Sequence, residues 1–263
     1  MRLILFTLIL AISLTSKEID HQKLDKILQL SDIEKLLINL ESLHKSTLQD
    51  LNSTNYSPST NKSIEIALIK SIPKNIFLNS TKKNMIDTLQ KEDIEYLYNW
   101  YTSDFGKKVM SLDTGFIKPN TTIEEFQKSD PQRFALYLEF EKYSKNAHYF
   151  FTEHQIFALR NIATNELLLP NSKDIFIKTK KKLVSNWYKN YYINKIQDNI
   201  LFLNINTFAP LTLTELQEYK SFLEHNSTQK LNNALLESYN ESSFKILENY
   251  KKELKKAFSS KSF

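Results

Sequence analysis

Glycine occurs only twice in the 263 residues, at Gly106 and Gly115, and this scarcity limits the folds that the chain can adopt. Tight β-hairpins and phosphate-binding loops need glycine at backbone positions that other residues adopt poorly. Apolar side chains instead recur three and four positions apart along most of the chain, which is the spacing of amphipathic helices. We therefore expect an all-α fold, a multi-helix array or bundle without a sheet.

Capping signals divide this helical pattern into segments. Three capping boxes, in which Ser or Thr is followed by Glu three residues later, begin at Ser31, Thr122 and Thr212. The polar stretch from Asn52 to Asn61 is expected to be a loop. The main expected helices run over residues 32–51 and 82–89, from Pro131, from Thr152 to before Pro170, from Ser172 or Lys173 to about Asn206, and from Lys230 to Phe258.

The most distinctive local pattern is a helical signature over residues 93–112, with the sequence DIEYLYNWYTSDFGKKVMSL. An acidic start and an apolar stripe lead to an aromatic pair, and a break with small residues is followed by lysines. A weaker copy, ELQEYKSFLEHNSTQKLNNAL, covers residues 215–235, offset by 122 positions. The copies indicate two related helical halves, residues 17–148 and 149–263, in one array. The signature residues are Ile94, Leu97, Trp100, Tyr101, Ser103, Gly106, Lys107 and Lys108.

This pattern resembles the DUF2059 family of exported bacterial proteins, which are all-helical and have no assigned chemistry. The family commonly has Ser-Pro before the glycine, where this chain has Ser103 and Asp104. The second copy departs further, with Thr228 in place of the glycine. The resemblance implies a helical protein of the bacterial envelope and brings with it no catalytic residue.

Two interpretations of the break in the signature are open. Ser103 or Asp104 can end one helix and cap the next, which places Gly106 in the first turn of the second helix. There the missing side chain would let another helix approach closely. Alternatively, the break forms a ligand notch beside Trp100.

The N-terminus has the pattern of a secretory signal peptide over residues 1–16. Met1 and Arg2 give the positive start, residues 3–14 are almost wholly apolar, and Ala11-Ile12-Ser13 offers a site for cleavage near residues 13–16. The apolar run is shorter than the about 20 residues that cross a bilayer. We expect an exported protein, periplasmic or secreted, without a membrane-spanning segment after cleavage. A buried first helix or an uncleaved anchor is the alternative.

Composition excludes several kinds of chemistry. The chain has no cysteine, which rules out disulfides, cysteine-zinc sites and thiol catalysis. Its formal charge is +5, but Arg2, Arg133 and Arg160 are its only arginines. Because nucleic-acid readers favour Arg for bidentate contacts, we expect no nucleic-acid partner. The lysine-rich stretches 178–182 and 245–256 are interpreted as solvated helix faces.

Candidate catalytic or metal-binding residues are few. His148 and His154 lie six positions apart with Glu153 between them, whereas helical zinc sites place two histidines four apart. Glu95 and Glu139 are the acids closest to the apolar runs, but a carboxylate pair for hydrolysis depends on a separation in space. We assign no catalytic residue, cofactor or metal ligand.

Two aromatic clusters remain, one around Trp100 and one around Trp187. They are interpreted as core and helix crossings, or as a groove or patch for a peptide, lipid or glycan. The leading functional prediction is a non-catalytic envelope protein that binds another protein or a cell-wall component. The alternatives are a cell-wall glycan or peptide hydrolase that uses carboxylates, and a carrier of an apolar ligand.

Overall fold

The computed structural model describes residues 20–31, 56–72, 75–112, 122–169, 171 and 173–259. Within these residues helices alternate with short turns and caps, and no strand occurs. The prediction of an all-α array without a sheet is confirmed for this part of the chain. The described helices are α2 (His21–Leu30), α4 (Pro58–Ser71), α5 (Ile76–Thr88), α6 (Lys91–Thr102), α7 (Asp104–Met110), α8 (Ile123–Ser129), α9 (Pro131–Ser144), α10 (Asn146–Leu168), α11 (Lys173–Leu183), α12 (Asn186–Phe208), α13 (Leu213–Glu224) and α14 (Asn226–Ser259).

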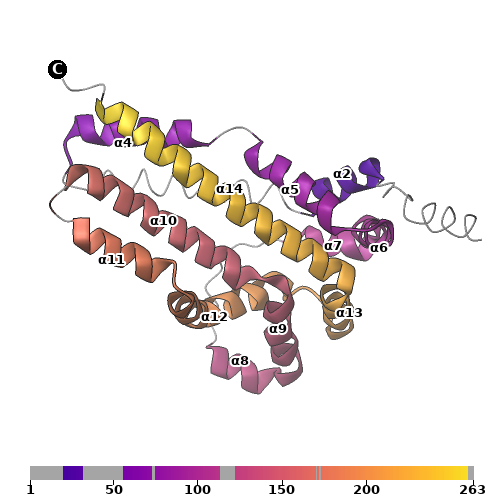
Figure 1. Cartoon of the computed structure of the whole chain (residues 1–263). Helices are drawn as coiled ribbons and strands as arrows, with labels where there is room; N and C mark the ends of the chain where they lie inside the picture. Colours follow the sequence, from indigo (N-terminus) through magenta and orange to yellow (C-terminus); the bar gives the residue numbers. More distant parts are fainter. Residues whose placement is uncertain are drawn as a thin grey trace, which may run out of the picture.

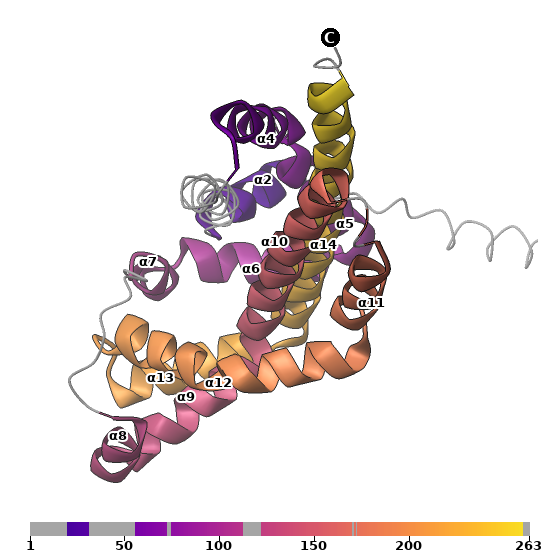
Figure 2. The ribbon, with the colours of Figure 1, turned by 90° about the vertical axis from the view of Figure 1, so that its left-hand side faces the viewer.

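The longest helix, α14, forms the axis of the fold (Figure 1). Helices α4, α5 and α10 pack along its 34 residues. Ser238, Ser242 and Ser243 on α14 are each at most 2 % exposed. Because their side chains are small, the neighbouring helices can approach α14 closely. In Figure 2, α4 and α11 flank the α10–α14 pair on opposite sides.

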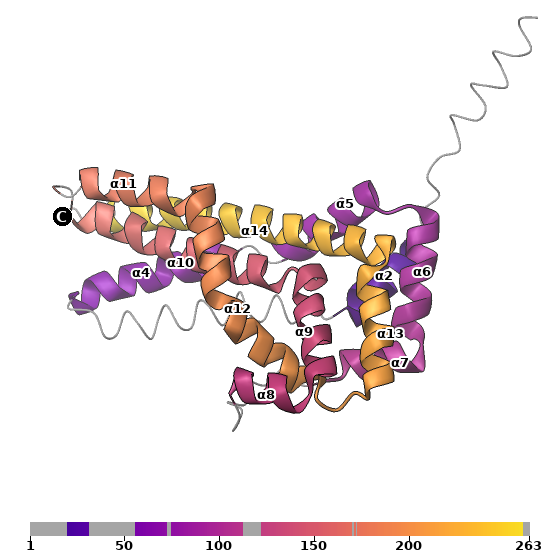
Figure 3. The same cartoon turned by 90° about the horizontal axis from the view of Figure 1, so that it is seen from below.

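A second group of helices gathers at the N-terminal end of α14. Helix α2 packs on α6, α9 packs on α12 and α13, and α12 also packs on α10. Figure 3 shows α6 and α13 side by side at this end, with α9 and α12 beside them. The largest buried apolar cluster joins these helices around Leu97, Leu201 and Leu231. This cluster also carries the candidate site.

Two of the predicted capping boxes are confirmed. Thr122 and Glu125 exchange side-chain and backbone hydrogen bonds at the start of α8, and Thr212 and Glu215 do the same at the start of α13. At the start of α6, the Asp93 carboxylate accepts a hydrogen bond from the backbone amide of Gln90 at 2.9 Å, so Gln90 stands where the predicted boxes have Ser or Thr. These caps satisfy amides that have no partner within their helix.

One predicted loop end and one predicted helix start are wrong. Pro58 begins α4 inside the segment predicted as a loop, because Ser57 caps the helix and proline fits its first position. Helix α10 begins at Asn146 instead of Thr152, directly after Lys145. Lys145 has a φ of 64°, so one left-handed residue turns the chain between α9 and α10.

The long helix predicted from residue 173 to about Asn206 is broken in two. Helix α11 ends at Leu183, and the Ser185 hydroxyl caps α12 by accepting the backbone N–H of Tyr188 at 3.2 Å. The apolar spacing continues through this break, so periodicity alone predicted one helix. A serine hydroxyl can replace a helical backbone partner, which is why it can end a helix without proline or glycine.

The boundary predicted between the halves, after residue 148, falls inside α10. Helices α4 and α5 from the first half pack on α14 from the second. Chain segments on either side of the boundary therefore share one core.

The predicted signal peptide, the helix expected over residues 32–51 and Gly115 lie outside the described residues. Among the helices that the structure describes, none combines the length and the hydropathy needed to span a bilayer.

Candidate functional site

The two copies of the signature pack against each other. The first copy forms α6 and α7, and the second forms most of α13 and the start of α14. Trp100 and Phe222 occupy the same position in the two copies. Their rings stack with centroids 3.5 Å apart and planes inclined by 8°.

Two ion pairs repeat this relationship. Lys230 Nζ lies 2.7 Å from Asp93 Oδ2, and Lys108 pairs with Glu215. The two acids are offset by 122 positions, and so are the two lysines. Each copy thus gives its lysine to the acid of the other copy. Such an exchange of equivalent partners is what a two-fold axis produces, so the copies are related by approximate two-fold symmetry at this contact.

Both carboxylates are held in their charged form. The hydrogen bond from Lys108 lowers the pKa of Glu215 to about 2, aided by the backbone amide at the α13 cap. Burial alone would raise the pKa of Asp93, but hydrogen bonds from Lys230, from a backbone amide and from a serine hydroxyl together lower that pKa. The ion pairs therefore fix the charge pattern of the contact between the copies.

Two of the remaining signature residues, Ser103 and Gly106, form the corner between α6 and α7. Ser103 ends α6 and caps α7, since its hydroxyl accepts the backbone N–H of Gly106 at 2.9 Å. The same hydroxyl donates to the carbonyl oxygen of Trp100 at 2.7 Å. Lys107 is exposed. Three signature side chains are at most 6 % exposed, those of Ile94, Leu97 and Tyr101.

The space beside Gly106 is filled by the preceding helix. A Cβ atom at Gly106 would overlap the carbonyl oxygen of Trp100 and lie 2.9 Å from its carbonyl carbon. The close neighbour is thus the last turn of α6 itself, brought back by the corner at Ser103. The indole N–H of Trp100 is buried and has no hydrogen-bond partner among the described residues.

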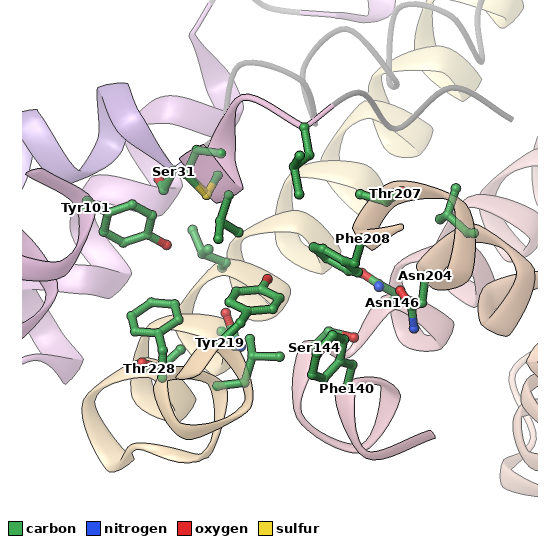
Figure 4. A pocket seen from close by; sticks show the side chains of 18 residues that line it. Ser31, Tyr101, Phe140, Ser144, Asn146, Asn204, Thr207, Phe208, Tyr219 and Thr228 are labelled. Carbon is green, nitrogen blue, oxygen red and sulfur yellow. The ribbon is translucent and has the colours of Figure 1, made fainter. Parts of the chain in front are cut away.

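A cavity of about 270 Å³, open on one side, lies next to this contact. Figure 4 shows Tyr101, Tyr219 and Phe208 around its centre. Phe222, which stacks on Trp100, is part of its wall. Larger hollows of about 330 and 420 Å³ lie at the surface along α14 and are lined partly by lysines. The aromatic side chains that line the cavity are Tyr101, Phe140, Phe208, Tyr219 and Phe222.

Three buried polar atoms of the cavity lining have no hydrogen-bond partner among the described residues: Asn204 Nδ2, Thr207 Oγ1 and Thr228 Oγ1. Their residues are 3 %, 7 % and 1 % exposed. Asn204 and Thr207 lie three positions apart on α12, and Figure 4 shows Thr228 on the other side of Tyr219. An unpaired buried donor or acceptor costs about 1–3 kcal/mol. A molecule bound in the cavity would lie against these three residues.

The sequence did not single out Asn204 and Thr207. Both interrupt the apolar run ILFLNINTF on α12, and a polar residue inside an apolar run is a usable signal for a buried polar group. Thr228 was noted only because it replaces glycine in the second copy. Thr228 lines the cavity, whereas Gly106, at the equivalent position of the first copy, lies against the backbone of α6.

The acids proposed for hydrolysis lie elsewhere. Glu95 pairs with Lys23, and Glu139 Oε2 lies 3.9 Å from Lys142 Nζ. Both are partly exposed, and neither lines the cavity. The structure therefore brings neither acid to the candidate site.

The group around His148 is packed between α10 and its neighbours. Burial raises the pKa of Glu153, whose carboxylate accepts a hydrogen bond from Tyr239 at 2.9 Å. Burial lowers the pKa of His148 and of His154, and His154 Nε2 lies 2.8 Å from the Tyr188 hydroxyl oxygen. Among the residues described, no cluster of three or more His, Asp or Glu side chains could hold a metal ion.

The two aromatic clusters have different surroundings. Trp100 is stacked between helices, whereas Trp187 and Tyr191 are 64 % and 51 % exposed. Their rings lie parallel with centroids 5.6 Å apart. The second cluster is therefore a surface feature of α12.

No protein-family model, no curated protein and no solved structure matches this chain. The resemblance to the DUF2059 family stays a prediction.

Proposed function

We propose that this protein is a non-catalytic binding protein that holds a small neutral molecule in the aromatic cavity. The observation that carries the proposal is a cavity with five aromatic residues in its wall, together with three lining residues that each have a buried polar atom without a partner. Of the predicted functions, this is closest to the carrier of an apolar ligand. The ligand needs an apolar body together with at least one polar group.

The chemistry of the wall defines the ligand class. The described lining residues carry apolar, aromatic, hydroxyl and amide side chains. Burial of a charge without a counter-charge costs far more than burial of a neutral polar group, so a neutral ligand fits best. Asn204 Nδ2 is a donor and calls for a carbonyl, ether or hydroxyl oxygen, while the two threonine hydroxyls can donate or accept. The volume is at the small end of ligand pockets, which span roughly 300–1,000 Å³.

The location of this activity rests on the sequence. The signal-peptide pattern at residues 1–16 supports a periplasmic or secreted protein that meets its ligand in the bacterial envelope. A binding protein in that compartment needs neither a cofactor nor a nucleotide. The proposal keeps the non-catalytic role and makes the bound component a small molecule.

A pair of probes with nearly the same shape tests the role of the polar atoms. 2-Acetylnaphthalene has a carbonyl acceptor that 2-ethylnaphthalene lacks, and both can compete with the neutral fluorescent probe N-phenyl-1-naphthylamine. We expect the wild-type protein to bind the ketone about fivefold more tightly, because one recovered hydrogen bond contributes about 1 kcal/mol. Asn204→Leu should abolish that preference without reducing stability, since it removes a donor that has no partner in the described structure.

Thr81→Val is the matched control. Thr81 is also fully buried with an unpaired hydroxyl, but it lies on α5 and does not line the cavity. Its substitution should leave the preference for the ketone unchanged. If no probe binds, or if Asn204→Leu keeps the full preference, the cavity is not the ligand site.

A further inference from the structure

The junction of α11 and α12 exposes apolar side chains that the fold does not cover with any described residue. Trp187 and Tyr191, four positions apart on α12, form the stacked pair described above. Val184 precedes them in the turn. Each of the three is among the exposed large hydrophobic residues of the described chain. We call Val184, Trp187 and Tyr191 the α11–α12 patch. Ile175 and Ile177 are also exposed, but they lie two positions apart on α11 and so on different sides of that helix.

Lysines are frequent in the segment that carries the patch. Residues 173–191 contain six lysines and only one acidic residue, Asp174. Lys180 pairs with Glu166 of α10, but Lys181 and Lys182 are exposed in the last turn of α11. Lys182 Nζ lies 5.7 Å from the ring centroid of Trp187, so a positive charge sits directly over the aromatic surface. The helix dipole favours lysines in a last turn, but it does not account for the exposed side chains of Val184 and Trp187.

We propose that the α11–α12 patch docks on an anionic phospholipid membrane surface. Trp and Tyr side chains prefer the headgroup level of a bilayer, where one side of the ring is apolar and the other is wet. Exposed aliphatic side chains enter the outer acyl region, and lysines are attracted by anionic headgroups. The mixture of exposed apolar and basic residues on one helix junction therefore matches this surface.

Two other occupants fit less well. Protein interfaces are depleted in lysine, whereas lysine is the main polar component here. A second copy of the chain would bring two lysine-rich patches together, and their like charges would repel each other. Membrane docking through residues 173–191 is independent of the ligand proposed for the cavity.

Sedimentation of the mature chain, without the apolar residues 1–16, with vesicles tests the proposal. We expect binding to phosphatidylcholine vesicles that contain phosphatidylglycerol, weak binding to pure phosphatidylcholine, and loss of binding in high salt. Lys181→Glu combined with Lys182→Glu should weaken binding to the anionic vesicles by about tenfold or more. The matched control, Lys255→Glu combined with Lys256→Glu, changes the net charge equally at the end of α14 and should bind like the wild-type protein.

The fluorescence of Trp187 reports the docking site directly. Its emission should shift to shorter wavelength on anionic vesicles, and Trp187→Phe should remove the shift. Vesicle binding without this shift would mean that another segment carries the chain to the membrane, and it would overturn the proposal. If the α14 control lost vesicle binding equally, net charge alone would explain the binding, and the proposal would be wrong. If the wild-type protein self-associates in the absence of vesicles and Trp187→Ser abolishes this self-association, the patch binds a second copy of the chain instead of a membrane.

Discussion

Gly106→Ala tests whether the corner between α6 and α7 depends on the missing side chain. The added Cβ would overlap the carbonyl oxygen of Trp100 and approach its carbonyl carbon to 2.9 Å. Carbon atoms in contact normally lie about 3.5–4.0 Å apart. The obstacle is backbone, so no side-chain rotation can relieve the overlap, and α7 must move away from the last turn of α6.

The expected loss of stability follows from two opposing effects. Overpacking of a well-packed site costs about 1–3 kcal/mol, and an immovable neighbour places this substitution near the upper value. Alanine is better than glycine within a helix by about 1 kcal/mol. Gly106 has no positive φ, so alanine meets no additional backbone strain. The net expectation is a loss of about 2 kcal/mol, which lowers the melting temperature by roughly 4–8 °C in a chain of this size.

Urea denaturation followed by circular dichroism at the helical band measures this change. Thr228→Ala is the matched control, because Thr228 occupies the same position in the second copy but faces the cavity. Its effect should stay below about 1 kcal/mol. A Gly106→Ala variant as stable as the wild-type protein would show that the corner yields easily and that the overlap does not determine the role of Gly106.

Two further predictions concern pH. Burial raises the pKa of Glu153, so the contribution of its protonated form to stability is fullest below the pKa of a free glutamate and is lost as pH rises through the raised value. Glu153→Gln keeps an acceptor for Tyr239 and should melt at a higher temperature than the wild-type protein at alkaline pH, but not in acid; equal melting curves at every pH would contradict this. For Glu215 the sign is opposite, because its pKa is lowered to about 2. The contribution of Glu215 to stability is present above the pKa of a free glutamate and is lost as pH falls toward 2. Lys108→Met removes the ion pair and should therefore make the melting temperature less sensitive to acid in that range. An unchanged sensitivity to acid would argue against the ion pair.

Much of the fold was predictable because it depends on local physics. The boxes at Thr122 and Thr212 and the helical spacing on either side of them gave correct helices. The break at Ser185 was missed, since serine can either continue a helix or cap one. Which outcome occurs depends on the packing of both segments against α10, and that packing is absent from the local pattern.

The candidate site was predictable only in part. The signature and its copy were recognised from the sequence, and their offset later explained the exchange of lysines between Asp93 and Glu215. The cavity was not recognised, because its wall combines residues from segments far apart in the chain. Asn204 and Thr228 look like ordinary polar residues until two helices bury them without partners.

The sequence by itself determined the helical class and two of the caps, and it predicted that two segments are related. These properties follow from the spacing of apolar side chains, from side-chain oxygens near backbone amides and from self-similarity, which all act over a few residues. The tertiary structure alone decided that the two segments meet with two-fold exchange, that Gly106 faces backbone while Thr228 faces a cavity, and that Trp100 is packed while Trp187 is exposed. The physical reason is that burial and pairing depend on which helix faces pack together. The packing of one helix face is set by the neighbouring helices as well as by its own residues.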